Sequence, residues 1–209
     1  MSLFNPVTVS CDFGGRKLTI ETGKLAKQAD GSVLVTYGET VVLVAAVSAS
    51  VMKDGIDFFP LTVEYQEKFY AAGRIPGGFF KREGRPTNDA TLIARMIDRP
   101  IRPLFPEGFF YDTQVIATVL SVDKLNDPEV CASVGASAAL AISSIPFKGP
   151  TAACRVGRID GKYVIIPSME QQETSDIDVF VAGTKNAIMM VVGGARVVPE
   201  DEVLGAILT

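Results

Sequence analysis

The sequence predicts an α+β fold, because strand and helix patterns occur in blocks along the chain and not in strict alternation. Period-two alternation, typical of strands, dominates residues 7–67 and 151–192. Two segments of helical character lie between these blocks, and a third follows them. The chain has 209 residues, of which 47% are apolar. It is therefore long enough for one large domain, or two small ones, with a buried core.

Five strands are expected in the first block. They are Val7–Phe13, Lys17–Glu21, Ser32–Tyr37, Thr40–Ser48 and Leu61–Glu67. Gly14-Gly15 separates the first two strands and Gly38-Glu39 the next two, so each pair is predicted to form a β-hairpin. In the fifth segment Leu61, Val63 and Tyr65 share one face and polar residues share the other, as expected for a strand.

The middle of the chain is predicted to contain two helices. A turn over residues 73–84 leads into the first helix, which is capped near Asn88 and ended by Pro100, because the residue before a proline is pushed out of the helical region. A strand, Thr113–Val122, follows. Asp127-Pro128 then starts a helix that runs to about Ser144, and its small side chains indicate close packing against a sheet.

Four more strands and a last helix are expected. The strands are Thr151–Ile159, Lys162–Ile166, Ile177–Ala182 and Ala187–Val192. Gly193-Gly194 lacks the spacing of a dinucleotide-binding fingerprint and is interpreted as a turn. The helix starts at Pro199, followed by three acidic residues. Its predicted core face consists of Val203, Leu204, Ile207 and Leu208. Because this helix reaches Thr209 without a cap, we expect the natural polypeptide to continue.

The composition argues against several kinds of site. There is no histidine, which removes the commonest general base and transition-metal ligand. Cys11, Cys131 and Cys154 are isolated and odd in number, so reduced thiols in a core are expected instead of disulfides or a zinc site. The stretch Val130–Phe147 is rich in Ala and Ser and is weak as a membrane span. Because no cationic, apolar leader follows Met1, a cytoplasmic protein without membrane contact is expected.

Positive charge is concentrated in one segment of this acidic chain. Between Arg74 and Arg102 seven cations face three anions, a local charge of +4 in a chain of net charge −4, so the other residues carry −8. Phe79 and Phe80 lie in the same segment. Aromatic rings beside guanidinium groups suit single-stranded nucleic acid, whose unstacked bases need a surface to stack on. The predicted RNA-binding residues are Phe79, Phe80, Lys81, Arg82, Arg85, Arg95, Arg99 and Arg102.

Several structural roles are open alternatives at this point. A core position, the usual one for phenylalanine, is the alternative for Phe79 and Phe80, although their place between glycines and cations disfavours it. Arg85 suits a bracing role in its turn, and Asp98 suits an ion pair with one of the helix arginines. Pro100 also disturbs the helical spacing that would align those arginines. Asp176 and Asp178 look like a metal-binding pair, but they lack a third ligand, which favours a solvated or hydrogen-bonded strand edge.

Four stretches together resemble one known family. They are IDFFPLTVEYQEK (Ile56–Lys68), GGFFKREGRP (Gly77–Pro86), LIARMIDRPIRPLFP (Leu92–Pro106) and VIATVLSVDKLNDPE (Val115–Glu129). In this order they are similar to the N-terminal core domain of bacterial-type polynucleotide phosphorylases. The resemblance implies an RNase PH-type core domain over residues 1–145 and a C-terminal subdomain of the same core over residues 146–209.

The resemblance also implies an enzymatic activity of the full-length protein, a phosphate-dependent 3'-to-5' exoribonuclease and polymerase that phosphorolyses RNA to nucleoside diphosphates in mRNA decay. The implied partners are single-stranded RNA, inorganic phosphate, nucleoside diphosphates, further copies in a homotrimeric ring and other RNA-decay proteins. Phe79–Arg82 matches the loop that lines the channel mouth in the family. Mg²⁺ would be held by a second core beyond Thr209. The alternative is an RNA-binding structural subunit of an exosome-like ring without catalytic activity.

No catalytic or metal-binding residue is predicted in this chain. In the family's active core a D-x5-D-x-K pattern holds the metal and the reacting phosphates. Aligned through Val181–Thr184, this pattern falls on Gln172, Asp178 and Phe180, so one of three groups remains. The family's phosphate-binding serine run falls on Asp127-Pro128-Glu129, where carboxylates repel phosphate and proline removes a backbone donor. The sequence therefore predicts a degenerate core that guides RNA.

Overall fold

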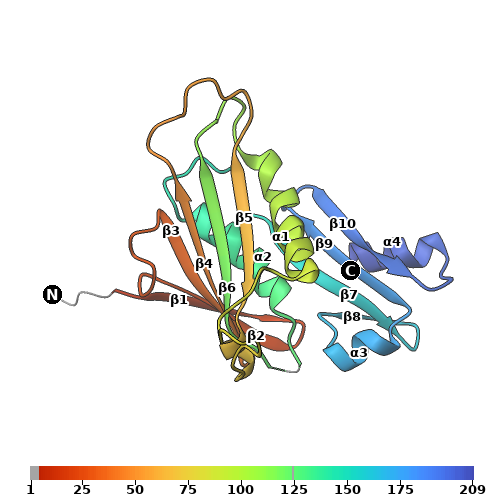
Figure 1. The fold of residues 1–209 in the computed structure, drawn as a ribbon. Coiled ribbons are helices and arrows are strands. Elements are labelled where there is room, and N and C mark those ends of the chain that lie inside the picture. Colours follow the sequence, from red (N-terminus) through yellow and green to blue (C-terminus); the bar gives the residue numbers. More distant parts are fainter. Residues whose placement is uncertain (1–4, 124) are drawn as a thin grey trace.

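The computed structural model describes residues 5–123 and 125–209, and their strands form two sheets (Figure 1). The first sheet consists of β1 (Val7–Phe13), β2 (Arg16–Thr22), β3 (Gly31–Tyr37), β4 (Thr40–Ser48), β5 (Leu61–Glu67) and β6 (Thr113–Ser121). Their order is β1-β2-β3-β4-β6-β5. Neighbours run antiparallel except β5 and β6, which are parallel. The predicted α+β class, the first five strands and both hairpins are confirmed.

Helix α2 (Pro128–Ala141) covers one face of the first sheet and packs against β3, β4 and β6 (Figure 1). Alternate residues of β3 and β4 are buried beneath it, as a period-two pattern requires. Gly135 permits this close packing, since a Cβ there would lie 2.6 Å from Val44 Cγ2. The helix starts where the sequence predicts, with Asp127 accepting a hydrogen bond from Glu129 N at 3.2 Å. It ends at Ala141 instead of about Ser144.

The second sheet lies beside the first and carries two short helices (Figure 1). Its order is β10-β9-β7-β8, with all neighbours antiparallel. The elements are β7 (Ala152–Ile159), β8 (Lys162–Ile165), α3 (Met169–Thr174), β9 (Ile177–Gly183), β10 (Ile188–Ala195) and α4 (Glu200–Leu208). The four predicted strands are present. The predicted turn at Gly193-Gly194 is wrong, because both glycines pair with β9 inside β10.

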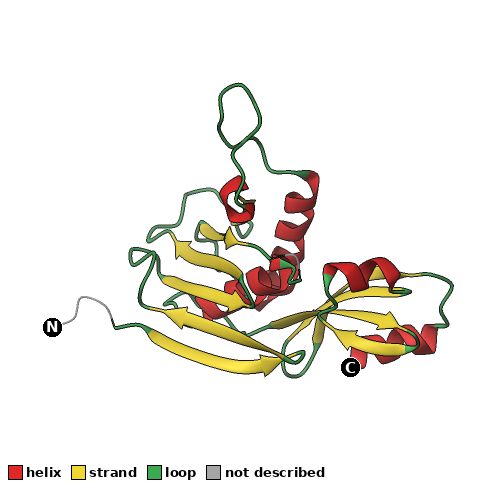
Figure 2. Ribbon diagram, turned by 90° about the horizontal axis from the view of Figure 1, so that it is seen from below, coloured by secondary structure: helices red, strands yellow, loops and turns green. Residues whose placement is uncertain are grey.

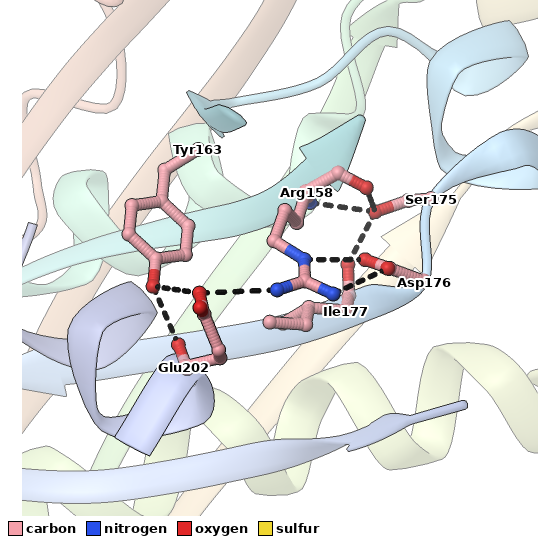
Figure 3. A network of polar contacts seen from close by, with 6 residues as sticks. All are labelled: Arg158, Tyr163, Ser175, Asp176, Ile177 and Glu202. Atoms are coloured by element: carbon pink, nitrogen blue, oxygen red, sulfur yellow. Dashed lines mark hydrogen bonds and ion pairs between the residues drawn. The ribbon is translucent and has the colours of Figure 1, made fainter. Parts of the chain in front are cut away.

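A polar network fixes α4 to the second sheet (Figure 3). Arg158 on β7 contacts Asp176 Oδ2 at 2.6 Å and Glu202 Oε2 at 3.0 Å. The hydroxyl of Tyr163 donates to the Glu202 carbonyl at 2.8 Å. The apolar anchor of α4 is Ala206, which is fully buried. The predicted core face is therefore wrong in part: its two leucines, Leu204 and Leu208, are 53% and 69% exposed, whereas the other two members are half-buried.

Helix α1 (Asn88–Ile101) packs against β5, α2 and β10. It follows the short 3₁₀ helix η1 (Phe69–Ala72) and continues into a second, η2 (Arg102–Leu104). The predicted end at Pro100 is wrong. Proline costs the helix one backbone donor, but Pro100, Ile97 and Ile101 are buried together, and Arg102 N still donates to the Asp98 carbonyl. Burial therefore outweighs the missing bond.

The cysteines are only partly core residues. Cys131 is buried and Cys154 is half-buried, but Cys11 is exposed on the edge strand β1, so the expectation of a core position is wrong for it. Over the residues that the structure describes, no helix is both long and apolar enough to cross a membrane.

Candidate functional site

The loop between η1 and α1 projects away from the two sheets (Figure 2). Phe79 and Phe80 at its tip are 94% and 77% exposed. The alternative that these two side chains belong to the hydrophobic core is therefore wrong. Their rings meet edge to face with centroids 5.4 Å apart. A turn closes the tip, with Lys81 N donating to the Gly78 carbonyl at 3.0 Å and Lys81 in the left-handed region at φ 48°. Two aromatic faces are thus presented to solvent.

The base of this loop is tied to the body of the protein. Glu83 Oε1 accepts a hydrogen bond from Phe69 N at 3.0 Å, which joins the loop to η1. The Arg82 guanidinium carbon lies 5.5 Å from the centroid of the Phe80 ring, a cation–π distance. Lys81, Arg82 and Arg85 are all exposed. The structure therefore brings four of the predicted RNA-binding residues, Phe79 to Arg82, together on one tethered loop.

The arginines of α1 differ in their surroundings. Arg95 and Arg99 are exposed. Arg102 contacts Asp98 Oδ1 at 2.7 Å, so the alternative of an ion pair for Asp98 is confirmed. Arg102 also donates to the carbonyls of Phe59 and Leu61 at 3.2 and 3.0 Å. Its guanidinium is thus a fixed part of the surface, while the other two side chains are free to reach a phosphate.

A second cluster surrounds Arg155 on β7, close to the start of α2. Arg155 Nε lies 2.6 Å from Glu129 Oε1 and 3.6 Å from Asp178 Oδ1. Its Nη1 lies 4.0 Å from Asp127 Oδ2 and donates to Gln172 Oε1 at 2.6 Å. One guanidinium thus faces three carboxylates and the side-chain amide of Gln172. Gln172 is the residue that aligns with the first carboxylate of the family's catalytic pattern.

Burial makes this cluster electrostatically strong. The Glu129 side chain is 4% exposed and that of Arg155 18% exposed. Burial, followed by the negative charge of Asp127, raises the pKa of Glu129 to about 8, and the positive charge of Arg155 opposes this rise. Phe180, at the aligned lysine position, is buried in the core. The cluster therefore holds more carboxylates than cations and offers no free cation to an incoming phosphate.

Sequence reasoning did not find Arg155. Its partners lie on α2, α3 and β9, and only the tertiary fold brings them to β7. The one available signal is an arginine inside the otherwise apolar start of a strand, AACRV. Asp176 accepts hydrogen bonds from Arg158, as the hydrogen-bonded alternative expects, and Asp178 Oδ1 lies 3.6 Å from Arg155 Nε. Within residues 5–123 and 125–209, no set of three acidic or cysteine side chains is arranged to hold a metal ion.

Comparison with known proteins covers almost the whole chain. Residues 14–146 match the family model described as 3' exoribonuclease family, domain 1, and residues 149–209 match domain 2 of the same family. Polyribonucleotide nucleotidyltransferase of Geotalea uraniireducens is 58% identical over 95% of this chain, and that of Brucella ovis is 57% identical over 99%. The chain spans 29% of the length of each.

The fold has a counterpart among solved structures. Rice (Oryza sativa) Rrp46 superposes with a TM-score of 0.67 over 99% of this chain and 87% of that chain, at 15% identity. At this identity the similarity concerns the fold alone. Together with the two domain matches, it confirms the RNase PH-type fold expected from the sequence.

Proposed function

Because the chain belongs to the 3' exoribonuclease family, we propose that it is part of a polyribonucleotide nucleotidyltransferase. The whole protein would phosphorolyse RNA from its 3' end and release nucleoside diphosphates. This chain would be a non-catalytic core that lines the RNA channel and supports a homotrimeric ring in the cytoplasm. The 57–58% identity to proteins of that name favours this function over a structural subunit of an exosome-like ring.

The Arg155 cluster is the observation that carries the non-catalytic role. A phosphorolytic site must hold a phosphate and a metal ion beside the scissile bond. Here the N-terminus of α2 carries Asp127 and Glu129, which disfavour an anion. Asp178, the one retained carboxylate, faces the guanidinium of Arg155 at 3.6 Å. The one carboxylate retained from the catalytic pattern thus already has a cationic partner.

The projecting loop supports the RNA-guiding role. Phe79 and Phe80 supply exposed stacking surfaces, and Lys81 and Arg82 supply charge for the phosphate backbone. Chemistry would then take place in another core of the whole protein, which would also hold Mg²⁺. Partners in RNA decay belong to the same proposal.

Two measurements on this chain test the proposal. First, oligo-adenylate is incubated with the protein, phosphate and Mg²⁺, and ADP is measured; the expected release is none, and release at an enzymatic rate would refute the non-catalytic role. Second, binding of labelled oligo-adenylate is compared with that of Phe79→Ala and Phe80→Ala. Each lost stack should cost about 1–3 kcal/mol.

Leu92→Ala is a matched control for the binding measurement, because Leu92 is an apolar side chain on α1 that is 55% exposed and lies outside the loop. It should bind oligo-adenylate like the unaltered protein. Equal binding by the loop variants and the control would refute the guiding role of the loop.

A further inference from the structure

An aromatic hollow lies at the C-terminal end of α1, away from the projecting loop. It has a volume of about 370 Å³, within the range of about 300–1,000 Å³ found for small-molecule pockets. Its walls include Phe58, Phe59, Phe105, Phe109, Phe110 and Arg102. Phe58 is 62% exposed at the rim, while Phe105 is buried beneath it.

The geometry points to a second RNA contact: we propose that this hollow receives a nucleobase of the strand that the projecting loop binds. This inference rests on the proposed RNA-guiding function and adds a subsite to it. A flat, apolar slot with an edge of cationic character is what an unstacked base requires. Phe59 and Phe105 pack on each other with centroids 4.5 Å apart, and Phe105 and Phe109 stack at 5.8 Å with an interplanar angle of 19°. A base would therefore stack on the exposed ring of Phe58 at the rim and not between these rings.

Arg102 is held in a way that suits stacking more than phosphate binding. Its Nε and Nη2 donate to Asp98 at 3.1 and 2.7 Å, and Nη1 and Nη2 donate to two backbone carbonyls. The plane of the guanidinium is therefore fixed, and its carbon lies 5.9 Å from the Phe59 ring centroid. Glu107 also lines the hollow. Its carboxylate repels phosphate, which favours entry of a base over entry of the backbone.

Helix α1 connects the hollow with the loop. Because the helix continues through Pro100, Arg95, Arg99 and Arg102 remain in phase at spacings of four and three and share one face. Arg95 and Arg99 are exposed between the two aromatic sites. The 14 residues of α1 span about 21 Å. A strand with a rise of about 3.4 Å per nucleotide covers that length with about six nucleotides.

The length dependence of binding tests the subsite. Affinity is measured for oligo-adenylates of three and ten nucleotides with the unaltered protein, Phe58→Ala and the control Met52→Ala. Met52 is 44% exposed on the same connection but does not line the hollow. Phe58→Ala should weaken binding of the ten-nucleotide strand by at least about fivefold and leave the three-nucleotide strand unchanged. Met52→Ala should change neither.

A spectroscopic measurement separates stacking from a general effect on the fold. A ten-nucleotide strand carries 2-aminopurine, a fluorescent adenine analogue that is quenched by stacking, at successive positions. Quenching that Phe58→Ala relieves at one position is the expected result. Unchanged affinity and quenching in Phe58→Ala, with weaker binding by Phe79→Ala, would refute the subsite and leave the guiding function intact. Unchanged binding in both variants would refute the guiding function itself.

Discussion

Replacing Arg155 by methionine tests whether its guanidinium compensates the buried carboxylate of Glu129 at the start of α2. Methionine keeps much of the length and apolar volume of the arginine stem but removes the guanidinium. Glu129 then remains 4% exposed without its cation. Removing one partner of a buried pair costs about 3–5 kcal/mol, because the other charge is left uncompensated. We expect the free energy of unfolding to fall by the upper end of this range only at pH values at which Glu129 is ionised.

The pKa of Glu129 determines whether the loss of stability is larger at low or at high pH. The pKa of Glu129 is raised to about 8, mainly by burial, and Arg155 lowers it. The folded state therefore holds a proton that the unfolded state releases near the ordinary carboxyl pKa, so the contribution of Glu129 to stability is present at low pH and is lost as pH rises through about 8. Arg155→Met raises this pKa further. At pH 6 the carboxyl is protonated with or without Arg155. At pH 9, one unit above the pKa of Glu129 in the unaltered protein, the variant loses up to about 1.4 kcal/mol more, because its folded state keeps the proton that the unaltered protein releases.

Urea denaturation at pH 6 and pH 9 measures this difference. Arg158→Met is the matched control on the same strand. Its partner Asp176 is 40% exposed, and the hydrogen bond from Arg158 lowers the pKa of Asp176, so this carboxylate stays ionised from pH 6 to pH 9. The loss of stability in Arg158→Met should be equal at both pH values. Adding Glu129→Gln to Arg155→Met should remove the pH-dependent part. An equal loss for Arg155→Met at pH 6 and pH 9 would show that the guanidinium does not compensate Glu129.

Three further predictions concern the fold. Thr87→Ala removes the side chain that caps α1 and should cost about 0.5–2 kcal/mol in urea denaturation, whereas Thr87→Ser should cost little. Gly193→Ala places a Cβ 2.2 Å from a carbonyl oxygen of β9, whereas a Cβ at Gly194 meets nothing within 4 Å. Gly193→Ala should therefore lower the urea midpoint, and Gly194→Ala should not. Ala206→Leu overpacks a fully buried site and should cost about 1–3 kcal/mol, whereas Leu204→Lys should leave the midpoint unchanged.

The strands were predictable because burial of one face imposes a period of two on the sequence. The errors lie where tertiary contacts override local rules. Pro100 lies inside a helix because it is buried with its neighbours, and Gly193-Gly194 extends a strand because β9 is in pairing distance. Helix α3 was not predicted, although Ser168 and Gln171 form a capping box, because it has only six residues.

The site was predictable to the extent that its residues are neighbours in sequence. Phe79 and Phe80 are flanked by glycines and cations, and this local pattern is sufficient to expect exposure. Arg155 meets Gln172, 17 residues later, only across two elements of the fold. No short-range pattern reports such a contact. The alignment with an active core indicated what was missing from the site, and the structure shows that an arginine now faces the remaining carboxylate.

The division of cations into paired and exposed groups sets a limit on the salt dependence of RNA binding. A guanidinium that already faces carboxylates gains little from a phosphate, because it must first leave them. Only the exposed cations of the loop and of α1 then count. They are Arg74, Lys81, Arg82, Arg85, Arg95 and Arg99. Six phosphate contacts by a single strand give a slope of log K against log salt of about −4.2. Fluorescence anisotropy of labelled oligo-adenylate between low and high NaCl measures this slope, and Lys81→Gln should reduce it by about 0.7. A slope steeper than about −5 would mean that paired arginines exchange carboxylates for phosphates, which contradicts a closed Arg155 cluster.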